Sequence, residues 1–131
     1  MTVPKSKRRE TKIEFVHNAR VIEDFCIRHW DERFSSILQR CIQLSAEIYD
    51  AVSQANSIYP TNQGEYKQRT IYLKRALSTA YALKGQLSLA YRHQKISTAV
   101  LLDINEYIEK QKRLLKGVIK KDKERYSGLS L

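Results

Sequence analysis

Residues 34–55 read FSSILQRCIQLSAEIYDAVSQA, and this stretch decides the class of the fold. Steps of four and three residues place side chains on one face of an α-helix, whereas a strand alternates with a period of two. The stretch therefore predicts a long amphipathic helix over about residues 32–57. The residues that recur at these steps are Phe34, Leu38, Cys41, Ser45, Ile48, Val52 and Ala55.

The segment before this stretch predicts another helix. Thr11 and Glu14 have the spacing of a capping box, so we expect the first helix to begin at Thr11 and to end near Trp30. Asp31 is the expected cap of the helix that follows. The buried face of the first helix is predicted to carry Phe15, Ala19, Ile22 and Cys26.

The segment after it predicts two more helices. Residues 59–64 form the strongest loop signal in the chain, and Asn62 with Glu65 has the capping spacing for a helix over about residues 64–91. Ser97 is the expected cap of a last helix over about residues 98–122. Their predicted buried faces carry Tyr66, Leu73, Leu77, Ala80, Leu83, Leu87 and Ala90, then Leu101, Ile104, Ile108, Leu115 and Ile119.

The composition agrees with one bundle of long helices, because 4 Gly and 2 Pro among 131 residues are too few turn signals for a sheet protein. We predict an all-α, antiparallel up-down-up-down four-helix bundle over residues 11–122, with a basic tail at 1–10 and a C-terminal tail at 123–131. No apolar run approaches the ~20 residues that span a bilayer. We therefore expect no membrane partner and a cytoplasmic location, with Cys26 and Cys41 as reduced, buried thiols.

The net charge of +10 lies at the two ends of the chain. Residues 1–12 carry +4 and residues 110–125 carry +6, whereas residues 13–109 sum to zero. In an antiparallel bundle these two segments meet at one end, which also holds the loop before the third helix. The sequence predicts a basic pole there, made of Lys5, Lys7, Arg8, Arg9, Lys12, Lys67, Arg69, Lys112, Arg113, Lys116, Lys120 and Lys121.

We expect this basic pole to bind the phosphates of RNA or DNA, with little sequence specificity because no reading helix or RNA-binding motif is recognisable. Lys112, Lys116 and Lys120 form like-charge i, i+4 pairs, which are unfavourable by a few tenths of a kcal/mol each. The tyrosines expected near the basic pole are candidates for stacking on unpaired bases: Tyr59, Tyr66 and Tyr126. The alternatives are a solvated run of charge and complementation of the helix dipole in the last turn.

The last helix is apolar over a wider arc than one core face needs. Val100, Tyr107 and Leu114 form a second line at seven-residue spacing beside the buried face. We interpret this second line as an interface between subunits, and the alternative is a broad core.

The sequence does not indicate an enzyme or a metal site. Glu14 and His17 have the E-x-x-H spacing of di-iron bundles, but such a site needs a second copy and further inward acids. No phosphate-binding glycine loop and no nucleophile–base–acid set occurs either. We therefore predict a non-catalytic protein with no metal and no cofactor.

Several short segments resemble one family of bacterial four-helix-bundle proteins that are encoded beside reverse transcriptases. The segments are Val3-Pro-Lys-Ser-Lys-Arg-Arg9 leading into Glu14-Phe15, Ala55-Asn-Ser-Ile-Tyr-Pro60, Glu65-Tyr66 with Arg69, and Ile108-Glu109 to Leu114-Leu115-Lys116-Gly117. They are similar to the accessory variability determinant (Avd) proteins of diversity-generating retroelements.

This resemblance implies a homopentameric basic barrel that binds a reverse transcriptase and its template RNA or cDNA. Such a protein supports mutagenic cDNA synthesis without catalysing it. Two other functions stay open on the sequence: a ribosomal-RNA-associated four-helix bundle, and a structural scaffold that binds proteins through its apolar faces and binds no nucleic acid.

Overall fold

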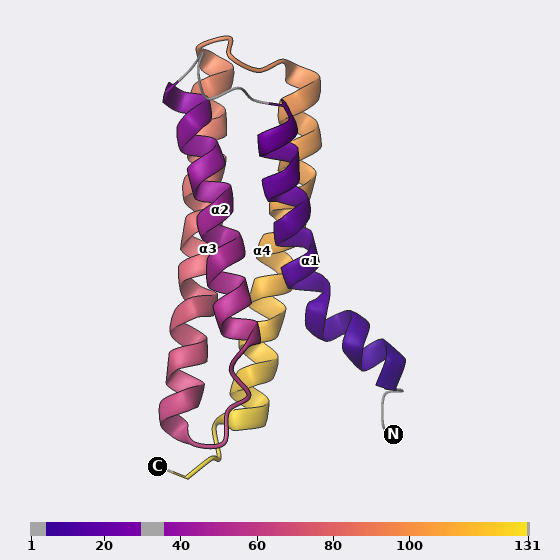
Figure 1. Ribbon diagram of the computed structural model, residues 1–131, viewed down its shortest axis with the longest axis vertical. Coiled ribbons are helices and arrows are strands. Elements are labelled where there is room, and N and C mark those ends of the chain that lie inside the picture. The colour runs from indigo at the N-terminus through magenta and orange to yellow at the C-terminus, as the bar shows by residue number, and fades with distance from the viewer. Residues whose placement is uncertain (1–4, 30–35, 131) are drawn as a thin grey trace.

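The computed structural model describes residues 5–29 and 36–130, with side chains described for residues 14–27 and 36–130. Nearly all of this part of the chain is helical (Figure 1). The helices are α1 Lys5–His29, α2 Ser36–Asn56, α3 Gln63–Arg92 and α4 Thr98–Tyr126. The predicted all-α four-helix bundle is confirmed.

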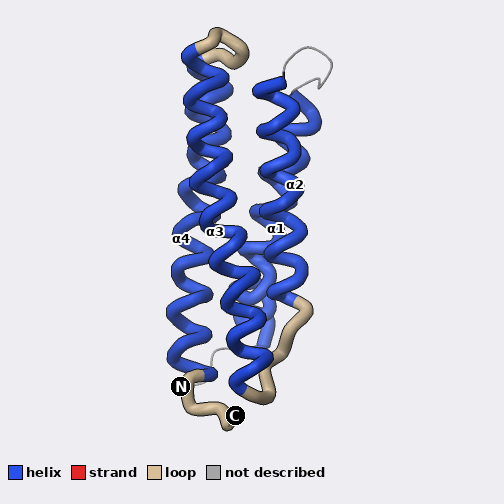
Figure 2. Tube along the Cα trace, turned by 90° about the vertical axis from the view of Figure 1, so that its left-hand side faces the viewer, coloured by secondary structure: helices blue, strands red, loops and turns tan. Residues whose placement is uncertain are grey.

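Successive helices pack against one another and run in opposite directions. Helix α1 packs on α2, α2 on α3, α3 on α4, and α4 returns to α1, while within the described ranges the backbones of the diagonal pairs stay farther apart. Figure 2 shows α3 and α4 side by side, with the α2–α3 loop and the α3–α4 loop at opposite ends of the bundle. The end of α4 therefore lies beside the start of α3, where the backbone N–H of Gln63 donates to the carbonyl of Ser130 at 3.0 Å.

The core follows the predicted periodicity. All four predicted core residues of α1 are at most 1% exposed, and the predicted α2 face is buried from Leu38 onward. In α3 and α4 the predicted faces are also buried, except that Tyr66, Leu77, Leu101 and Ile119 are only partly buried. Phe34 lies outside the described residues. The residues that complete this core without having been predicted include Leu44, Ala51, Ala76 and Ile96.

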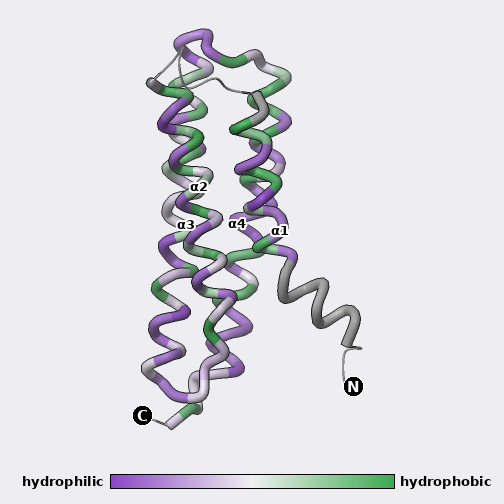
Figure 3. Tube along the Cα trace, in the orientation of Figure 1, coloured by the Kyte–Doolittle hydropathy of each residue, from purple (hydrophilic) through white to green (hydrophobic). Residues whose placement is uncertain are grey.

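Hydrophobic and hydrophilic residues alternate along α2, α3, α4 and the coloured part of α1 (Figure 3). Burial of an Ile or Leu side chain of this core stabilises the fold by about 1.5–3 kcal/mol relative to exposure. In the described ranges, no helix combines the length and the apolar character needed to cross a bilayer.

Two predicted helix caps are confirmed. The Asn62 side chain accepts a hydrogen bond from the backbone N–H of Glu65 at 2.9 Å, and Ser97 accepts from the backbone N–H of Val100 at 3.2 Å. Each cap satisfies a backbone donor that has no partner inside the helix. The Glu65 carboxylate in turn accepts hydrogen bonds from Thr61, which lower the pKa of Glu65.

Two predicted helix limits are wrong, and a third lies outside the described residues. Helix α1 begins at Lys5, six residues before the predicted start at Thr11, so Thr11 and Glu14 form no capping box. Arginine and lysine are good helix formers, which explains why the basic segment before Thr11 continues the helix. At the other end of the chain α4 runs to Tyr126, past the predicted limit at 122. Helix α2 is described from Ser36, and the predicted cap Asp31 lies outside the described residues.

A buried pair of amides joins α1 to α4. The Asn18 side chain donates to the Gln111 side chain at 2.9 Å and to the carbonyl of Tyr107 at 3.0 Å, and Gln111 donates to the carbonyl of Phe15 at 3.0 Å. Neither amide is more than 3% exposed. Since buried polar groups need partners, this network fixes the register of α1 on α4. Below it, the first turns of α1 diverge from the bundle (Figure 1).

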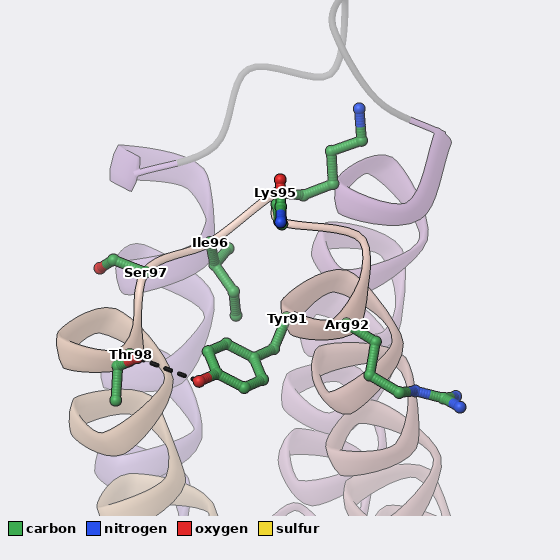
Figure 4. A pocket seen from close by; sticks show the side chains of 7 residues that line it. Tyr91, Arg92, Lys95, Ile96, Ser97 and Thr98 are labelled. Carbon is green, nitrogen blue, oxygen red and sulfur yellow. Dashed lines mark hydrogen bonds between the residues drawn. The ribbon is translucent and has the colours of Figure 1, made fainter.

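Helix α3 ends in a tight turn in which Gln94 takes the position where glycine is usual. Gln94 has φ 59°, a left-handed conformation in which glycine is usual. The backbone N–H of Lys95 donates to Ala90 at 2.8 Å and that of Gln94 to Tyr91 at 3.0 Å, the two bonds of a Schellman motif. Ile96 then turns into the core, and the Tyr91 and Thr98 hydroxyls share a hydrogen bond across the loop (Figure 4).

Candidate nucleic-acid interface

Arg69 holds the end of the bundle together through four hydrogen bonds inside the chain. Its guanidinium donates to the Asp122 carboxylate at 2.6 and 3.4 Å, and to the carbonyls of Ala55 at 2.9 Å and Ile58 at 3.3 Å. The Arg69 and Asp122 side chains are only 12% and 5% exposed. A buried arginine that ties α2, α3 and α4 together is a structural residue, and we remove Arg69 from the candidate interface.

Lys112 is also engaged inside the chain. Its ammonium lies 3.0 Å from the Glu109 carboxylate and 4.4 Å from the centroid of the Tyr81 ring, and the residue is only 9% exposed. Lys84 reaches the same carboxylate from α3 at 2.6 Å. The ammonium groups of Lys84 and Lys112 lower the pKa of Glu109 to about 2. Lys112 therefore neutralises an acid and supports Tyr81, and we remove it too from the candidate interface.

The cations that remain on α4 form a stripe. Arg113, Lys116 and Lys120 are exposed, as predicted for solvated residues, and Lys123 continues the same steps of three and four residues. At about 1.5 Å per residue this stripe extends for roughly 15 Å along α4. Lys121 is also exposed, but it follows Lys120 directly and so projects about 100° away around the helix.

A parallel line of residues runs along α3. Lys67 and Lys74 are exposed and are followed, again after seven residues, by Tyr81, which is 48% exposed. Tyr81 meets the α4 stripe, because the Lys116 ammonium lies 5.8 Å from the centroid of its ring and lowers the pKa of its hydroxyl. Two lines of cations thus face outward along one helix pair. We call this the α3–α4 basic surface: Lys67, Lys74, Tyr81, Arg113, Lys116, Lys120 and Lys123.

The sequence reasoning missed Lys74 and Lys123, and it missed that the surface lies along a helix pair. The signal was present in the distribution of charge. Residues 14–65 hold eight acidic and four basic residues, whereas residues 66–102 hold seven basic residues and no acid. The net charge of residues 13–109 is zero because acidic and basic segments cancel. For this reason only the chain ends showed an excess of charge.

The predicted basic pole at the two chain ends stays a prediction. Antiparallel packing does place the start of α1 and the end of α4 toward the same end of the bundle, but the first turns of α1 lean away from it (Figure 1). The side chains of the predicted phosphate-binding residues in this segment lie outside the described part of the chain; they are Lys5, Lys7, Arg8, Arg9 and Lys12. The candidate interface therefore rests on α3 and α4.

The three tyrosines predicted near this end behave differently from Tyr81. Tyr66 and Tyr126 are partly buried and pack on each other, with ring centroids 6.0 Å apart. Tyr59 is 71% exposed in the α2–α3 loop. Among these tyrosines, Tyr81 has both exposure and a position inside a row of cations.

The second apolar line on α4 is half-buried within a single chain. Val100, Tyr107 and Leu114 pack against the core, and the Tyr107 ring lies 6.5 Å from that of Phe25. Part of this line is thus explained by the broad core that was the alternative interpretation. The interface between subunits stays a prediction.

The described residues contain no group of three or more His, Cys, Asp or Glu side chains that could hold a metal ion. Glu14 instead lies 3.4 Å from the Lys110 ammonium. Cys26 and Cys41 are free and buried, and burial raises the pKa of the Cys26 thiol to about 12 and that of Cys41 to about 11. Both thiols therefore stay protonated and act as core residues.

An open depression at the α3–α4 loop is lined by polar and aromatic residues, among them Tyr91, Arg92 and Lys95 (Figure 4). It lies at the far end of α3 from Lys67 and does not join the α3–α4 basic surface. Comparisons with protein-family models, with curated proteins and with solved structures give no match to this chain.

Proposed function

We propose that this protein is a non-catalytic accessory protein that binds nucleic acid through the α3–α4 basic surface. The observation that carries the proposal is the row of exposed cations on α4, spaced three and four residues apart, beside a second row on α3. Like charges at this spacing repel by a few tenths of a kcal/mol per pair. The internal acids do not relieve this repulsion, because Asp122 is used by Arg69 and Glu109 by Lys84 and Lys112.

A polyanion offsets such repulsion. Phosphates held by lysine and arginine release condensed counterions, which makes the affinity fall steeply with salt concentration. Since the sequence contains no recognisable reading helix or RNA-binding motif, we expect phosphate contacts and little sequence specificity. A purely structural scaffold would leave this row of cations without a role.

The identity of the partners follows from the resemblance to Avd proteins. On that basis we propose that the nucleic acid is the template RNA or the cDNA of a retroelement, and that the protein partner is the reverse transcriptase of that element. We also propose that the protein acts in the cytoplasm as a homo-oligomer, with five subunits as the expected number. Light scattering tests the assembly, since a monomer in solution removes this version of the proposal.

Nucleic-acid binding is tested by fluorescence anisotropy with labelled RNA over a range of salt concentrations. The variant R113Q/K116Q/K120Q removes three charges from the surface, and R40Q/R92Q/K95Q removes three exposed charges elsewhere. We expect the first variant to lose roughly tenfold or more in affinity at low salt and to show a shallower salt dependence. The control variant should stay close to the natural protein. Equal losses in both variants, or binding that ignores salt, would contradict the proposal.

A further inference from the structure

We propose that the α3–α4 basic surface takes a single strand of RNA or DNA, with one base stacked on Tyr81. This inference rests on the proposed function and specifies the form of nucleic acid that the surface selects. It is carried by the placement of one exposed aromatic ring within a double row of cations.

Tyr81 is exposed and yet held in place. The residue is 48% exposed, and the Lys112 ammonium lies 4.4 Å from the centroid of its ring. Lys112 cannot move freely, because its ammonium is also bound to Glu109 at 3.0 Å and the residue is only 9% exposed. An aromatic ring that is fixed from one side and open to solvent loses little conformational freedom when a base stacks on it.

The cations around Tyr81 are placed to follow a backbone. Lys67 and Lys74 precede Tyr81 on one line of α3, and Lys116 approaches its ring from α4. The remaining cations of the surface continue away from the ring on α4, namely Lys120 and Lys123 on one side and Arg113 on the other. A charged track with an aromatic platform inside it is how proteins bind single strands without reading their sequence.

A duplex makes poor use of this arrangement. Its bases are stacked on one another in the interior, so a side chain on a flat helical surface reaches only phosphates and sugars. A single strand exposes the faces of its bases, and stacking on an aromatic ring then adds to the phosphate contacts. The contribution of Tyr81 should therefore appear with single strands and vanish with duplexes.

The test compares a labelled single-stranded oligonucleotide of roughly 12 nucleotides, a length within the usual site sizes of single-strand binders, with the duplex of the same sequence. Tyr81→Phe keeps the ring, and Tyr81→Leu keeps apolar volume without it. Tyr91→Leu serves as the control, because Tyr91 is also on α3 and 41% exposed but lies outside the surface. Circular dichroism confirms that each variant is folded.

We expect Tyr81→Leu to weaken single-strand binding about tenfold and to change duplex binding by less than about twofold. Tyr81→Phe and Tyr91→Leu should bind both forms as the natural protein does. If the natural protein binds neither form, the proposed function itself fails. If it binds both and Tyr81→Leu affects neither, or weakens both equally, the proposed function stands and the stacking role of Tyr81 is overturned.

Discussion

The two halves of the bundle are built differently. Residues 5–56, which hold α1 and α2, carry nine basic and eight acidic residues, whereas residues 63–126, which hold α3 and α4, carry fifteen basic and six acidic residues. The α1–α2 half contains the buried thiols and packs mainly through apolar contacts. The α3–α4 half is tied by ion pairs across its helices, Arg69 with Asp122 and Lys84 with Glu109.

The difference separates two uses of charge in one small protein. In the α3–α4 half Asp122, the buried acid of the described residues, is paired with Arg69, and four of the other cations project outward in a row on α4. Neutralised charge stabilises the fold, and surplus charge is left for a partner. The charges of the α1–α2 half nearly cancel, so its stability should depend mainly on apolar packing.

The largest effect is expected from a cavity in the α1–α2 half. Ile22 is fully buried, and Ile22→Ala should lower the free energy of unfolding by about 3 kcal/mol because it removes apolar contacts and leaves a cavity. Urea denaturation measures this loss, which should be the same at low and high salt. A loss that shrinks with added salt would show that charge also holds this half.

The next effect is expected from the ion pair that ties α3 to α4. Asp122→Asn should lower the free energy of unfolding by about 2 kcal/mol, since it leaves the buried Arg69 guanidinium without its counter-charge but with two carbonyl acceptors. Glu124→Gln, two residues further along α4 and exposed, is the matched control and should cost almost nothing. If the two substitutions lowered the free energy of unfolding equally, the buried ion pair would contribute no more to stability than an exposed charge, which would contradict the prediction.

A smaller effect is expected from pH. Glu109 has a pKa of about 2 in the folded protein instead of the ordinary 4.5, so its ion pairs stabilise the fold above pH 4.5 and are lost as the pH falls toward 2. Because the carboxylate is 40% exposed, solvent screening limits the contribution to less than about 1 kcal/mol. Stability curves of Glu109→Gln and the natural protein should converge at low pH; a constant difference between them over the whole range would contradict the assignment.

The smallest effect is a gain of stability in the α3–α4 half. Gln94→Gly removes the cost of a left-handed backbone at φ 59° and should raise the free energy of unfolding by about 0.5 kcal/mol, because the greater freedom of glycine in the unfolded chain offsets part of the relief. Gln94→Ala should bring no such gain. Thermal unfolding of the two variants measures the difference.

The sequence predicted the helix faces and helix caps, which depend on residues close together in the chain. The alternating steps in α2 marked Cys41, Ile48 and Val52 as core, and the caps Asn62 and Ser97 followed from residues three positions apart. The predicted start of α1 at Thr11 was wrong, although it also relied on residues close in sequence. Thr11 has the right spacing for a cap, but the good helix formers before it continue the helix, so the local signal was overridden.

The candidate interface depends on pairs that are distant in the chain. Arg69 and Asp122 are 53 residues apart, and only the register of α3 against α4 shows that they neutralise each other. Lys112 looked like its exposed neighbours in sequence, yet it turns inward toward Glu109 and Tyr81. Tyr81 gave no signal in sequence, because its importance comes from the cations that packing brings around it.

The uneven distribution of charge also has a consequence for encounters in solution. A bundle with one strongly cationic flank and a nearly neutral opposite flank has an uneven field across its width, so an approaching polyanion turns it before the molecules touch. The productive orientation is then selected during diffusion, and the rate of association falls as ions screen the long-range field. The concentration of positive charge on one flank therefore makes association with a polyanion fast without a deep cleft.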